Sequence, residues 1–390
     1  MITIATIDQQ LSQQSRFCLI DWLLTDNFID YSEYEAWRYE KNELLIDAIQ
    51  LNQEALRNLL ADTERHCRSL GLVSEPQEYF SWTNEKRKIL SASHNSQQNS
   101  QLTQCWLRPQ DQPQLDLFMD NTAQLVEHEL LQYLEARQFS LAQNILKKLS
   151  ELNAECPRLG GYQDLINYGL HMQANEQIDS EMLAAELTGL KTEVMPLAVE
   201  VLGQSTRDYL SFAWRRLANN MVNVNFDPAQ PELHASFALL EIPDYRSAVT
   251  GLLADTNLYQ QPILLERLAR SYLALHQDDN AMIVICLLME ADGDYAEDLL
   301  DDLKSYDIHR QWQDFWEEND AWPREHFPAY LMIKKPALIH QLDNFPPMMN
   351  PVTNAMTDLI KLKLNQEDEI PARKAMLELS KDLLYVYLDS

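Results

Sequence analysis

Glycine is scarce in this chain. Only 8 of its 390 residues are glycine, whereas an average protein contains about 7%. Leucine, alanine, glutamine and glutamate are frequent instead, and these residues favour helices. The phosphate-binding motifs GxGxxG and GxxxxGK followed by Ser or Thr do not occur, nor does the nucleophile motif GxSxG. The composition therefore predicts an all-α or mainly α protein without a glycine-rich nucleotide-binding loop.

Basic residues are also few. The chain has 31 lysines and arginines against 60 aspartates and glutamates, which gives a formal net charge of -29. Nonspecific nucleic-acid binding requires many cationic side chains to displace counterions from phosphates. We therefore expect no direct nucleic-acid binding and no membrane attachment. Three short basic clusters occur without interleaved aromatics: Lys86–Arg87–Lys88, Arg215–Arg216 and Lys334–Lys335.

Long apolar runs are missing as well. No apolar stretch reaches about 18 residues, the length expected of a membrane span. The first eight residues lack the basic start of a secretory signal. The cysteines are odd in number and form no CxxC pair: Cys18, Cys67, Cys105, Cys156 and Cys286. We expect reduced thiols in a cytoplasmic protein.

Helical signals are clear in residues 7–70. Asn52 is a typical N-cap and Gly71 a typical C-terminal cap, and apolar residues between them recur on one helical face. Asp30, followed three positions later by Glu33, resembles a capping box. An aromatic stripe follows at every third position, and we expect it to pack in the core rather than to hold a cofactor: Tyr31, Tyr34 and Trp37.

Residues 72–118 break this helical rhythm. Short runs compatible with β-strands include Tyr79, Phe80 and Trp82, then Ile89 and Leu90. Residues 94–104 are a polar stretch of low complexity. We expect either a small β-hairpin or an irregular segment here.

From Asn121 onward the helical period returns as pairs of helices. One apolar face ends near Leu134, a short turn follows, and a second face begins at Ala142. Such a pair joined by a short turn predicts an antiparallel hairpin. A similar pattern recurs farther on, where Ala281 follows Ala248 by 33 positions. A period of this length is typical of a helical solenoid unit.

These hairpins resemble the tetratricopeptide repeat, in which a small residue of the second helix packs against a large residue of the first. The residues that match are Tyr133, Phe139, Ala142, Leu146 and Leu149 in one copy; Leu265, Leu268, Ala269, Tyr272, Ala281, Ile285 and Leu288 in another; and Leu239, Tyr245, Ala248 and Leu252 in a weaker middle copy. The resemblance covers about a hundred residues. The chain departs from the family at Glu129, at the turns, which lack glycine, and in having no late proline.

The resemblance implies a stacked α-solenoid whose groove holds a partner peptide or helix. It also implies that specificity resides on the inner helices, at Glu266, Arg270 and Leu273. The tail reads as further helices between proline-containing connections, with residues 372–388 as a sealing terminal helix. We expect three regions: an N-terminal region 1–118, a tetratricopeptide-like region 119–295 and a C-terminal capping region 296–390.

The sequence contains no complete catalytic motif of the kinds considered, and the nearest is an incomplete zinc-binding pattern. His128 and Glu129 begin an HExxH-like pattern, but Gln132 replaces the second histidine, so a zinc site lacks a ligand. We expect no catalytic residues, no cofactor and no metal. The alternative is an enzyme whose site lies within residues 72–118.

The strongest charge feature is a stripe of carboxylates with helical spacing: Asp294, Glu297, Asp298, Asp301 and Asp302. The wider window from Glu290 to Glu325 contains 13 acidic and 3 basic residues. The stripe predicts either a solvated helix face or a docking face for a basic partner. We therefore expect a non-enzymatic interaction scaffold or adaptor, with an acidic nucleic-acid mimic as a further alternative.

Overall fold

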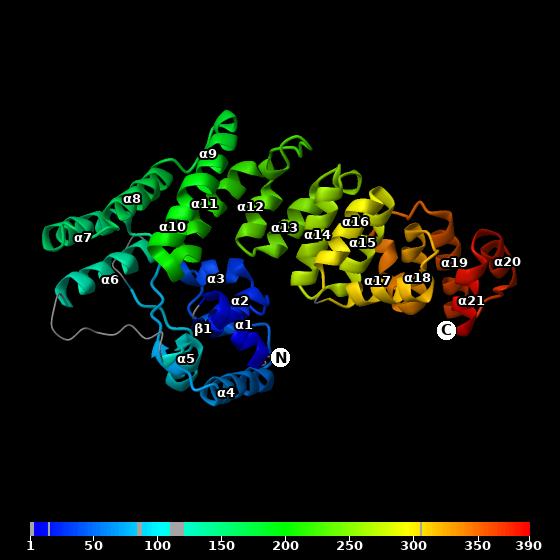
Figure 1. Cartoon of the computed structure of the whole chain (residues 1–390), viewed down its shortest axis with the longest axis horizontal. Coiled ribbons are helices and arrows are strands. Elements are labelled where there is room, and N and C mark those ends of the chain that lie inside the picture. The colour runs from blue at the N-terminus through cyan, green and yellow to red at the C-terminus, as the bar shows by residue number, and fades with distance from the viewer. Residues whose placement is uncertain (1–3, 15, 84–87, 110–120, 305) are drawn as a thin grey trace. The chain divides into compact units, whose positions relative to one another are not determined.

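The computed structural model (Figure 1) describes residues 4–14, 16–83, 88–109, 121–304 and 306–390. These residues are mainly α-helical with one small antiparallel sheet, which confirms the expected fold class. They form two compact units. Unit 1 comprises Met1–Val224 and Glu232–Asp244, and unit 2 comprises Asn225–Pro231 and Tyr245–Ser390. The boundary between the two units falls within residues 119–295, and the three expected regions stay a prediction.

Unit 1 combines the three strands with the first twelve α-helices. Its elements are α1 (Ile4–Gln14), β1 (Arg16–Cys18), α2 (Leu19–Thr25), α3 (Tyr31–Arg38), α4 (Gln53–Ser69), β2 (Val73–Pro76), α5 (Ser96–Thr103), β3 (Gln104–Leu107), α6 (Asn121–Glu135), α7 (Phe139–Leu152), α8 (Leu159–Ala174), α9 (Leu183–Gly189), α10 (Met195–Leu202), α11 (Thr206–Met221) and α12 (Ala235–Glu241).

The predicted helix ends in residues 30–71 are largely confirmed. The Asn52 side chain accepts a hydrogen bond from the backbone N–H of Ala55 at 2.8 Å and starts α4. Gly71 follows α4 with φ of 71°, a conformation that glycine adopts without strain. The capping box is wrong: Asp30 begins α3 without a side-chain cap bond, and Glu33 instead accepts from the Asn42 amide.

The aromatic stripe of α3 lies in the core, as expected. Tyr31, Tyr34 and Trp37 are each at most 1% exposed. Their rings are in mutual contact, with centroids 5.8 and 5.9 Å apart along the stripe. The Tyr34 ring also meets Trp82 edge-on. The helical spacing therefore places these rings against the segment that follows β2.

The strands form a three-stranded antiparallel sheet in the order β1-β3-β2. This sheet confirms β structure within residues 72–118, but its first strand comes from the N-terminal region. Cys18 and Cys105 lie opposite each other in β1 and β3 and form a disulfide. The expectation of five reduced thiols is therefore wrong, because strand pairing brings together two cysteines separated by 87 positions.

The polar stretch 94–104 forms a helix rather than a hairpin or loop. Asn95 caps α5 by accepting hydrogen bonds from the N–H groups of Gln97 and Gln98. Leu102 anchors this helix in the core at 1% exposure. The N-cap at Asn95 and the buried Leu102 thus stabilise α5, although the low-complexity composition of this stretch does not predict a helix. Residues 84–87 and 110–118 of the irregular segment lie outside the described residues.

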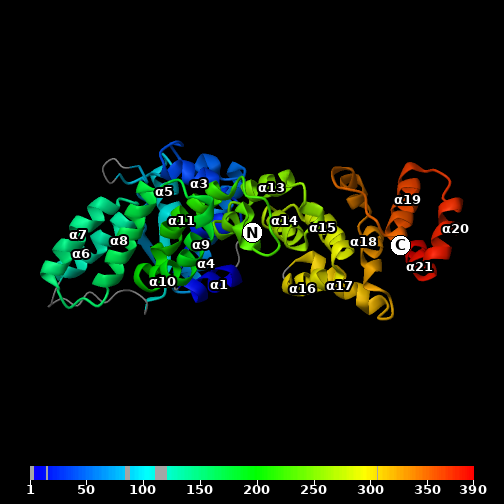
Figure 2. The same cartoon turned by 90° about the horizontal axis from the view of Figure 1, so that it is seen from above.

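Helices α6 and α7 form the predicted hairpin and lie side by side in Figures 1 and 2. Its turn is a Schellman motif: the N–H of Gln138 donates to the Tyr133 carbonyl, and the N–H of Arg137 donates to the Leu134 carbonyl. Arg137 occupies the left-handed position, with φ of 58°. Glycine is the usual residue there, so this arginine is retained at a cost in backbone strain.

The second predicted hairpin has the same turn. Between α14 and α15, the N–H of Gln277 donates to the Tyr272 carbonyl, and the N–H of His276 donates to the Leu273 carbonyl. His276 has φ of 55°, matching the left-handed residue of the first hairpin. The same motif, with a non-glycine residue at positive φ, also ends α3 at Glu40 and α19 at Gln366, so it does not distinguish the two hairpins from other helix ends. The tetratricopeptide resemblance stays a prediction.

Unit 2 is built from helices. Its elements are α13 (Tyr245–Ala254), α14 (Pro262–Ala274), α15 (Asp278–Ala291), α16 (Gly293–Asp302), α17 (Asp307–Glu318), α18 (Phe327–Lys334), α19 (Pro351–Asn365), α20 (Ile370–Leu379) and α21 (Lys381–Asp389). Helix α15 is central: it packs on α14, α16 and α18, and all its residues from Ala281 to Met289 are buried. Helices α18 and α19 pack on each other within the same unit (Figure 2).

Two expectations for helices need correction. The weak middle repeat copy is divided between the units, since α12 packs on α11 in unit 1 and α13 packs on α14 in unit 2. The expected terminal helix 372–388 is two helices, interrupted at Ser380. Leu383 and Leu384 of α21 are buried as predicted, whereas Leu377 is 48% exposed.

The contact between Phe139 and Gly169 generates a test of packing in unit 1. Phe139 at the start of α7 is fully buried, and a Cβ added at Gly169 of α8 would lie 2.5 Å from its ring. Replacing Gly169→Ala therefore forces the ring to move. We expect a loss of about 1–3 kcal/mol in the free energy of unfolding, measured by urea denaturation.

Gly160→Ala is the matched control on the same helix. Apart from its chain neighbours and the backbone of its own helix, no atom lies within 4 Å of the position that a Cβ would take at Gly160. Alanine should therefore leave stability unchanged or raise it by up to about 1 kcal/mol. Equal stability changes in the two variants would contradict the packing role of Gly169.

Candidate functional site

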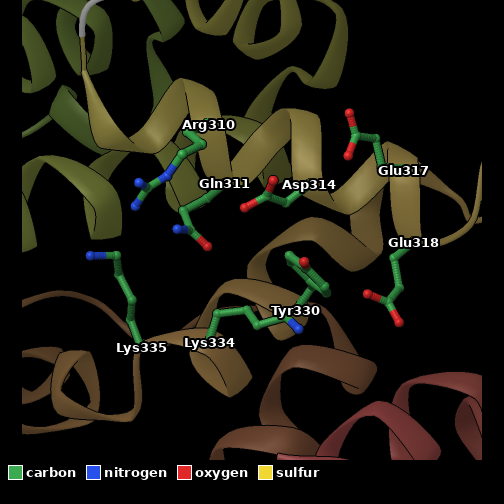
Figure 3. A pocket seen from close by; sticks show the side chains of 8 residues that line it. All are labelled: Arg310, Gln311, Asp314, Glu317, Glu318, Tyr330, Lys334 and Lys335. Atoms are coloured by element: carbon green, nitrogen blue, oxygen red, sulfur yellow. The ribbon is translucent and has the colours of Figure 1, made fainter.

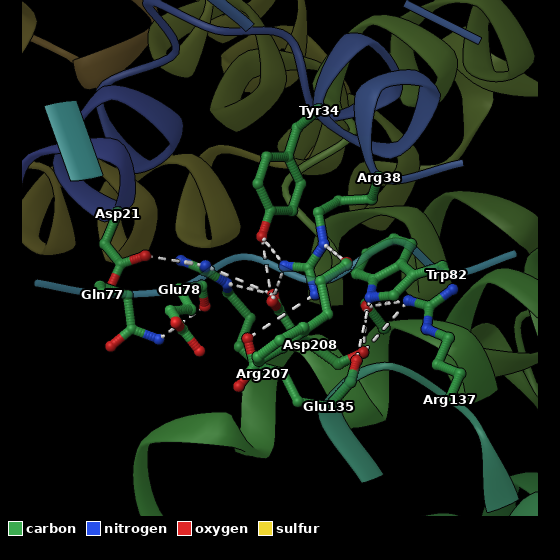
Figure 4. A network of polar contacts seen from close by, with 12 residues as sticks. Asp21, Tyr34, Arg38, Gln77, Glu78, Trp82, Glu135, Arg137, Arg207 and Asp208 are labelled. Carbon is green, nitrogen blue, oxygen red and sulfur yellow. Dashed lines mark hydrogen bonds and ion pairs between the residues drawn. The ribbon is translucent and has the colours of Figure 1, made fainter. Parts of the chain in front are cut away.

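A buried network of charged side chains lies in unit 1 (Figure 4). Its centre is the ion pair between Arg38 of α3, which is 0% exposed, and Asp208 of α11, with an Nη1–Oδ2 distance of 2.5 Å. Tyr34 donates its hydroxyl to the same carboxylate oxygen at 3.0 Å. Arg38 also donates from Nε to the Phe80 carbonyl. One guanidinium thus joins α3, α11 and the segment after β2.

Trp82 lies between two guanidinium groups in this network. The Arg38 guanidinium carbon is 4.4 Å from the ring centroid, and that of Arg137 is 3.3 Å away. Arg137 further donates to the Ser211 hydroxyl at 2.8 Å and to the Tyr39 hydroxyl at 2.8 Å. These bonds explain why an arginine occupies the strained left-handed turn position, since glycine would remove all of them.

Arginine contacts keep Asp208 ionised. Burial alone would raise the pKa of this carboxyl, but the charges of Arg38 and then Arg207 outweigh it and lower the pKa to about 2. Arg207 also bonds to Asp21 of α2 at 2.8 Å. Asp208 therefore acts as a fixed anion between two cations, a role that favours structure over proton transfer.

Glu135, the last residue of α6, has a raised pKa, in contrast to Asp208. Burial raises its pKa to about 7, and the negative charge of Asp208 adds to this, although Arg38 opposes it from 3.7 Å. Asp208, which pairs with the same guanidinium, repels an ionised Glu135, so the attraction of Arg38 does not outweigh desolvation. The two carboxyls therefore hold different protonation states near neutral pH.

Sequence reasoning missed this network. It assigned Tyr34 to the core correctly, but gave no role to Arg38, Arg137 or Asp208. Arg38 and Asp208 are 170 positions apart, and no local spacing connects them. The only local signal was an arginine at a turn position where the resembled family has glycine.

The predicted partner-binding residues lie on α14 and differ in exposure. Leu273 is 3% exposed and belongs to the core of unit 2. Glu266 and Arg270 are half-buried and form an ion pair at 2.8 Å. Arg270 also reaches Asp302 of α16 at 3.2 Å, and Tyr295 donates its hydroxyl to Glu266. Glu266 and Arg270 thus contact the acidic helix α16, whereas Leu273 is buried and cannot contact a partner.

The predicted acidic face lies on the surface of α16. Asp294, Asp298, Asp301 and Asp302 are exposed, and Glu297 is half-buried. Asp292, just before the helix, provides the N-cap by accepting from the N–H of Tyr295.

Cations reach only part of this acidic face. Arg324 pairs with Asp294 and Glu297, and Arg270 pairs with Asp302. Asp298 and Asp301 have no cationic partner among the residues that the structure describes. Negative charge at the middle of the face is therefore left to solvent.

A polar cleft of about 780 Å³ lies between α17 and α18 (Figure 3). Helix α17 contributes both charge signs, and α18 with the residue after it contributes an aromatic ring and two lysines. The lining residues are Arg310, Gln311, Asp314, Glu317, Glu318, Tyr330, Lys334 and Lys335. The acidic window from Glu290 to Glu325 and the Lys334–Lys335 cluster are visible in the sequence. That they line one cleft is visible only in the structure.

Asp307 holds two cations at one end of this cleft and offsets one of their two charges. It pairs with Arg310 and, at 2.7 Å, with Lys335. The pKa of Asp307 is lowered, chiefly by its hydrogen bond with Lys335. The charges at the other end, on Asp314 and Glu318, remain available.

The other sequence candidates for binding or metal chemistry are placed as follows. His128 shares a hydrogen bond of 3.0 Å with Gln132, so the HExxH-like residues pair with each other on an exposed helix face. Arg215 and Arg216 pair with carboxylates of unit 1. Lys86 and Arg87 lie outside the described residues. Within the described ranges, no cluster of three or more His, Cys, Asp or Glu side chains is suited to hold a metal ion.

Comparison with known proteins gave no match to a family model, to a curated protein or to a solved structure.

The raised pKa of Glu135 generates a pH-dependent prediction. The native state holds a proton up to about pH 7, whereas an unfolded glutamate, with its ordinary pKa of 4.5, releases it earlier. The contribution of Glu135 to stability therefore falls as pH rises from about 4.5 to 7. Glu135→Gln cannot lose a proton and so avoids this loss. Between about pH 5 and 7.5, the free energy of unfolding of the variant should therefore rise relative to that of the wild type by on the order of 2 kcal/mol.

The measurement is the free energy of unfolding from urea titrations at both pH values. Glu129→Gln, on the same helix, is the control and should follow the wild type. Asp208 does not interfere, because its lowered pKa affects stability only below about pH 4. Parallel pH curves for the wild type and Glu135→Gln would contradict the assignment.

Proposed function

We propose that the chain is a non-enzymatic scaffold or adaptor, and that unit 2 docks a protein partner with a basic surface. The observation that carries this proposal is a set of surface carboxylates without cationic partners in the described parts of unit 2: Asp298 and Asp301 on α16, and Asp314, Glu317 and Glu318 on α17. Accumulated negative charge attracts a basic partner and speeds its association.

The helical architecture supports the same proposal. Stacked antiparallel helix hairpins provide extended surfaces for other proteins. The ion pair between Arg270 and Asp302 joins α14 to α16. Glu266 and Arg270, the inner-helix residues implied by the tetratricopeptide resemblance, therefore lie beside the acidic face, and we include them in the proposed docking surface.

The alternatives lead to different expectations. An acidic nucleic-acid mimic would use the same carboxylates, and nucleic acid would then compete for its partner. An enzyme with its site in residues 72–118 gains no support, because the described residues of this segment supply the sheet, α5 and core aromatics such as Tyr79 and Trp82.

No helix in the described ranges is both long and apolar enough to cross a bilayer. The cytoplasmic location expected from the sequence stays a prediction, and the Cys18–Cys105 disulfide favours an oxidising compartment instead.

The proposal predicts that a basic peptide binds through α16. We would titrate the full-length chain into a fluorescein-labelled peptide of alternating arginine and glycine and follow its anisotropy. Replacing Asp298→Asn and Asp301→Asn removes two charges that support no internal ion pair. At about 0.5 kcal/mol for each exposed charge, affinity should fall roughly fivefold at low salt, and the difference should shrink as salt is raised.

Glu151→Gln with Glu155→Gln is the matched control, because it removes the same charge from exposed positions of unit 1. This variant should bind within about twofold of the wild type. Equal weakening by the two double variants would indicate a net-charge effect without a docking surface. Absence of peptide binding would contradict the proposed function itself.

A further inference from the structure

The cleft between α17 and α18 leaves both charge signs unpaired. Asp314, Glu317 and Glu318 have no ion-pair partner in the described part of the chain, and neither has Lys334. Arg310 and Lys335, by contrast, are held by Asp307. Counted together with Asp307, the cleft has four carboxylates against three cations, so its net charge is -1, and all three carboxylates without a partner lie on α17. The α17 side of the cleft is therefore negative and favours a cationic group.

Tyr330 provides an observation independent of this charge. Its side chain is 1% exposed and lines the cleft, yet its hydroxyl makes no hydrogen bond within the described ranges. Burial, followed by the nearby charges of Glu318 and Asp314, raises its pKa to about 12. The hydroxyl is therefore protonated at neutral pH and free to bond with a ligand. Figure 3 shows the ring with Asp314 and Glu318 on either side.

The Tyr330 ring is held rigidly. It packs edge-on against Phe315 of α17, with centroids 5.4 Å apart, and against Trp322 at 6.1 Å. Phe315 in turn contacts Trp312 and Phe327. Fixed aromatic neighbours pre-organise the floor of the cleft, which lowers the entropy lost when a ligand binds.

Lys334 shows that this ring accepts a cation. Its ammonium nitrogen lies 5.1 Å from the Tyr330 centroid, within the range of a cation–π contact. A stronger cation from a partner would replace it there. Lys334 would then be free to meet a carboxylate of the same partner.

We propose that the α17–α18 cleft binds an arginine side chain of a partner protein. Asp314 and Glu318 are spaced i, i+4 and share one face of α17, so two carboxylates can meet the donors of one planar guanidinium. The Tyr330 hydroxyl, which lines the cleft, can accept a hydrogen bond from a further guanidinium N–H. Its ring offers arginine a cation–π contact where the partner displaces Lys334. This inference rests on the proposed docking function and names the partner group that unit 2 recognises.

The experiment compares three labelled peptides that alternate glycine with arginine, lysine or the uncharged analogue citrulline. All are titrated into the full-length chain under one salt condition. The wild type should bind the arginine peptide at least about fivefold more tightly than the lysine peptide, because ammonium lacks the bidentate geometry. Citrulline should bind weakest.

The decisive variant is Asp314→Asn with Glu318→Gln. It should lose roughly tenfold in affinity for the arginine peptide and bring the arginine-to-lysine ratio close to one. Tyr330→Phe keeps the ring and should lower that ratio by a few fold. Asp298→Asn with Asp301→Asn removes the same charge from α16, and should weaken both peptides while keeping their ratio. Circular dichroism and thermal melting establish that each variant is folded.

Peptide binding and arginine selectivity test the docking function and the arginine site separately. If no cationic peptide binds, the proposed function fails. If basic peptides bind but the cleft variant keeps the arginine-to-lysine ratio of the wild type, docking stands and the arginine site is overturned. A wild-type ratio near one overturns it as well.

Discussion

The ion pair between Arg38 and Asp208 is the interaction on which the fold of unit 1 depends. It connects a helix near the N-terminus to one some 170 positions later, and it fixes Tyr34 and the Phe80 carbonyl around the same guanidinium. Removing either partner would leave a desolvated charge in the core, which typically costs several kcal/mol. Arg137 completes the network from a strained turn. Unit 1 is therefore held by charge pairing as well as by apolar packing.

Charges are placed differently in the two units. The chain has about one basic residue for every two acidic residues, and unit 1 places Arg38, Arg137 and Arg216 in its interior. Arg38 and Arg216 pair there with Asp208 and Glu186 of the same unit. The acidic character of α16 and α17 comes from their own sequences, and it gives unit 2 the charge from which its proposed docking role is argued.

The sequence predicts the local features of the fold well and the distant ones poorly. Asn52 and Gly71 define α4 because capping depends on neighbouring residues. The stripe at Tyr31, Tyr34 and Trp37 reveals its buried face for the same reason. The Cys18–Cys105 disulfide and the Arg38 network depend instead on chain segments brought together by folding. Likewise, the carboxylates of the cleft are visible in the helical spacing of α17, whereas the contribution of Tyr330 requires the packing of α18.

Hydrogen–deuterium exchange tests the central claim most directly. The full-length chain would be labelled with and without the saturating arginine–glycine peptide, and protection would be mapped along the sequence. A partner site on unit 2 predicts new protection in residues 293–334, which include α16, α17 and α18. Protection confined to unit 1, above all to residues 72–109, would contradict the account and move the binding site to the N-terminal part of the chain.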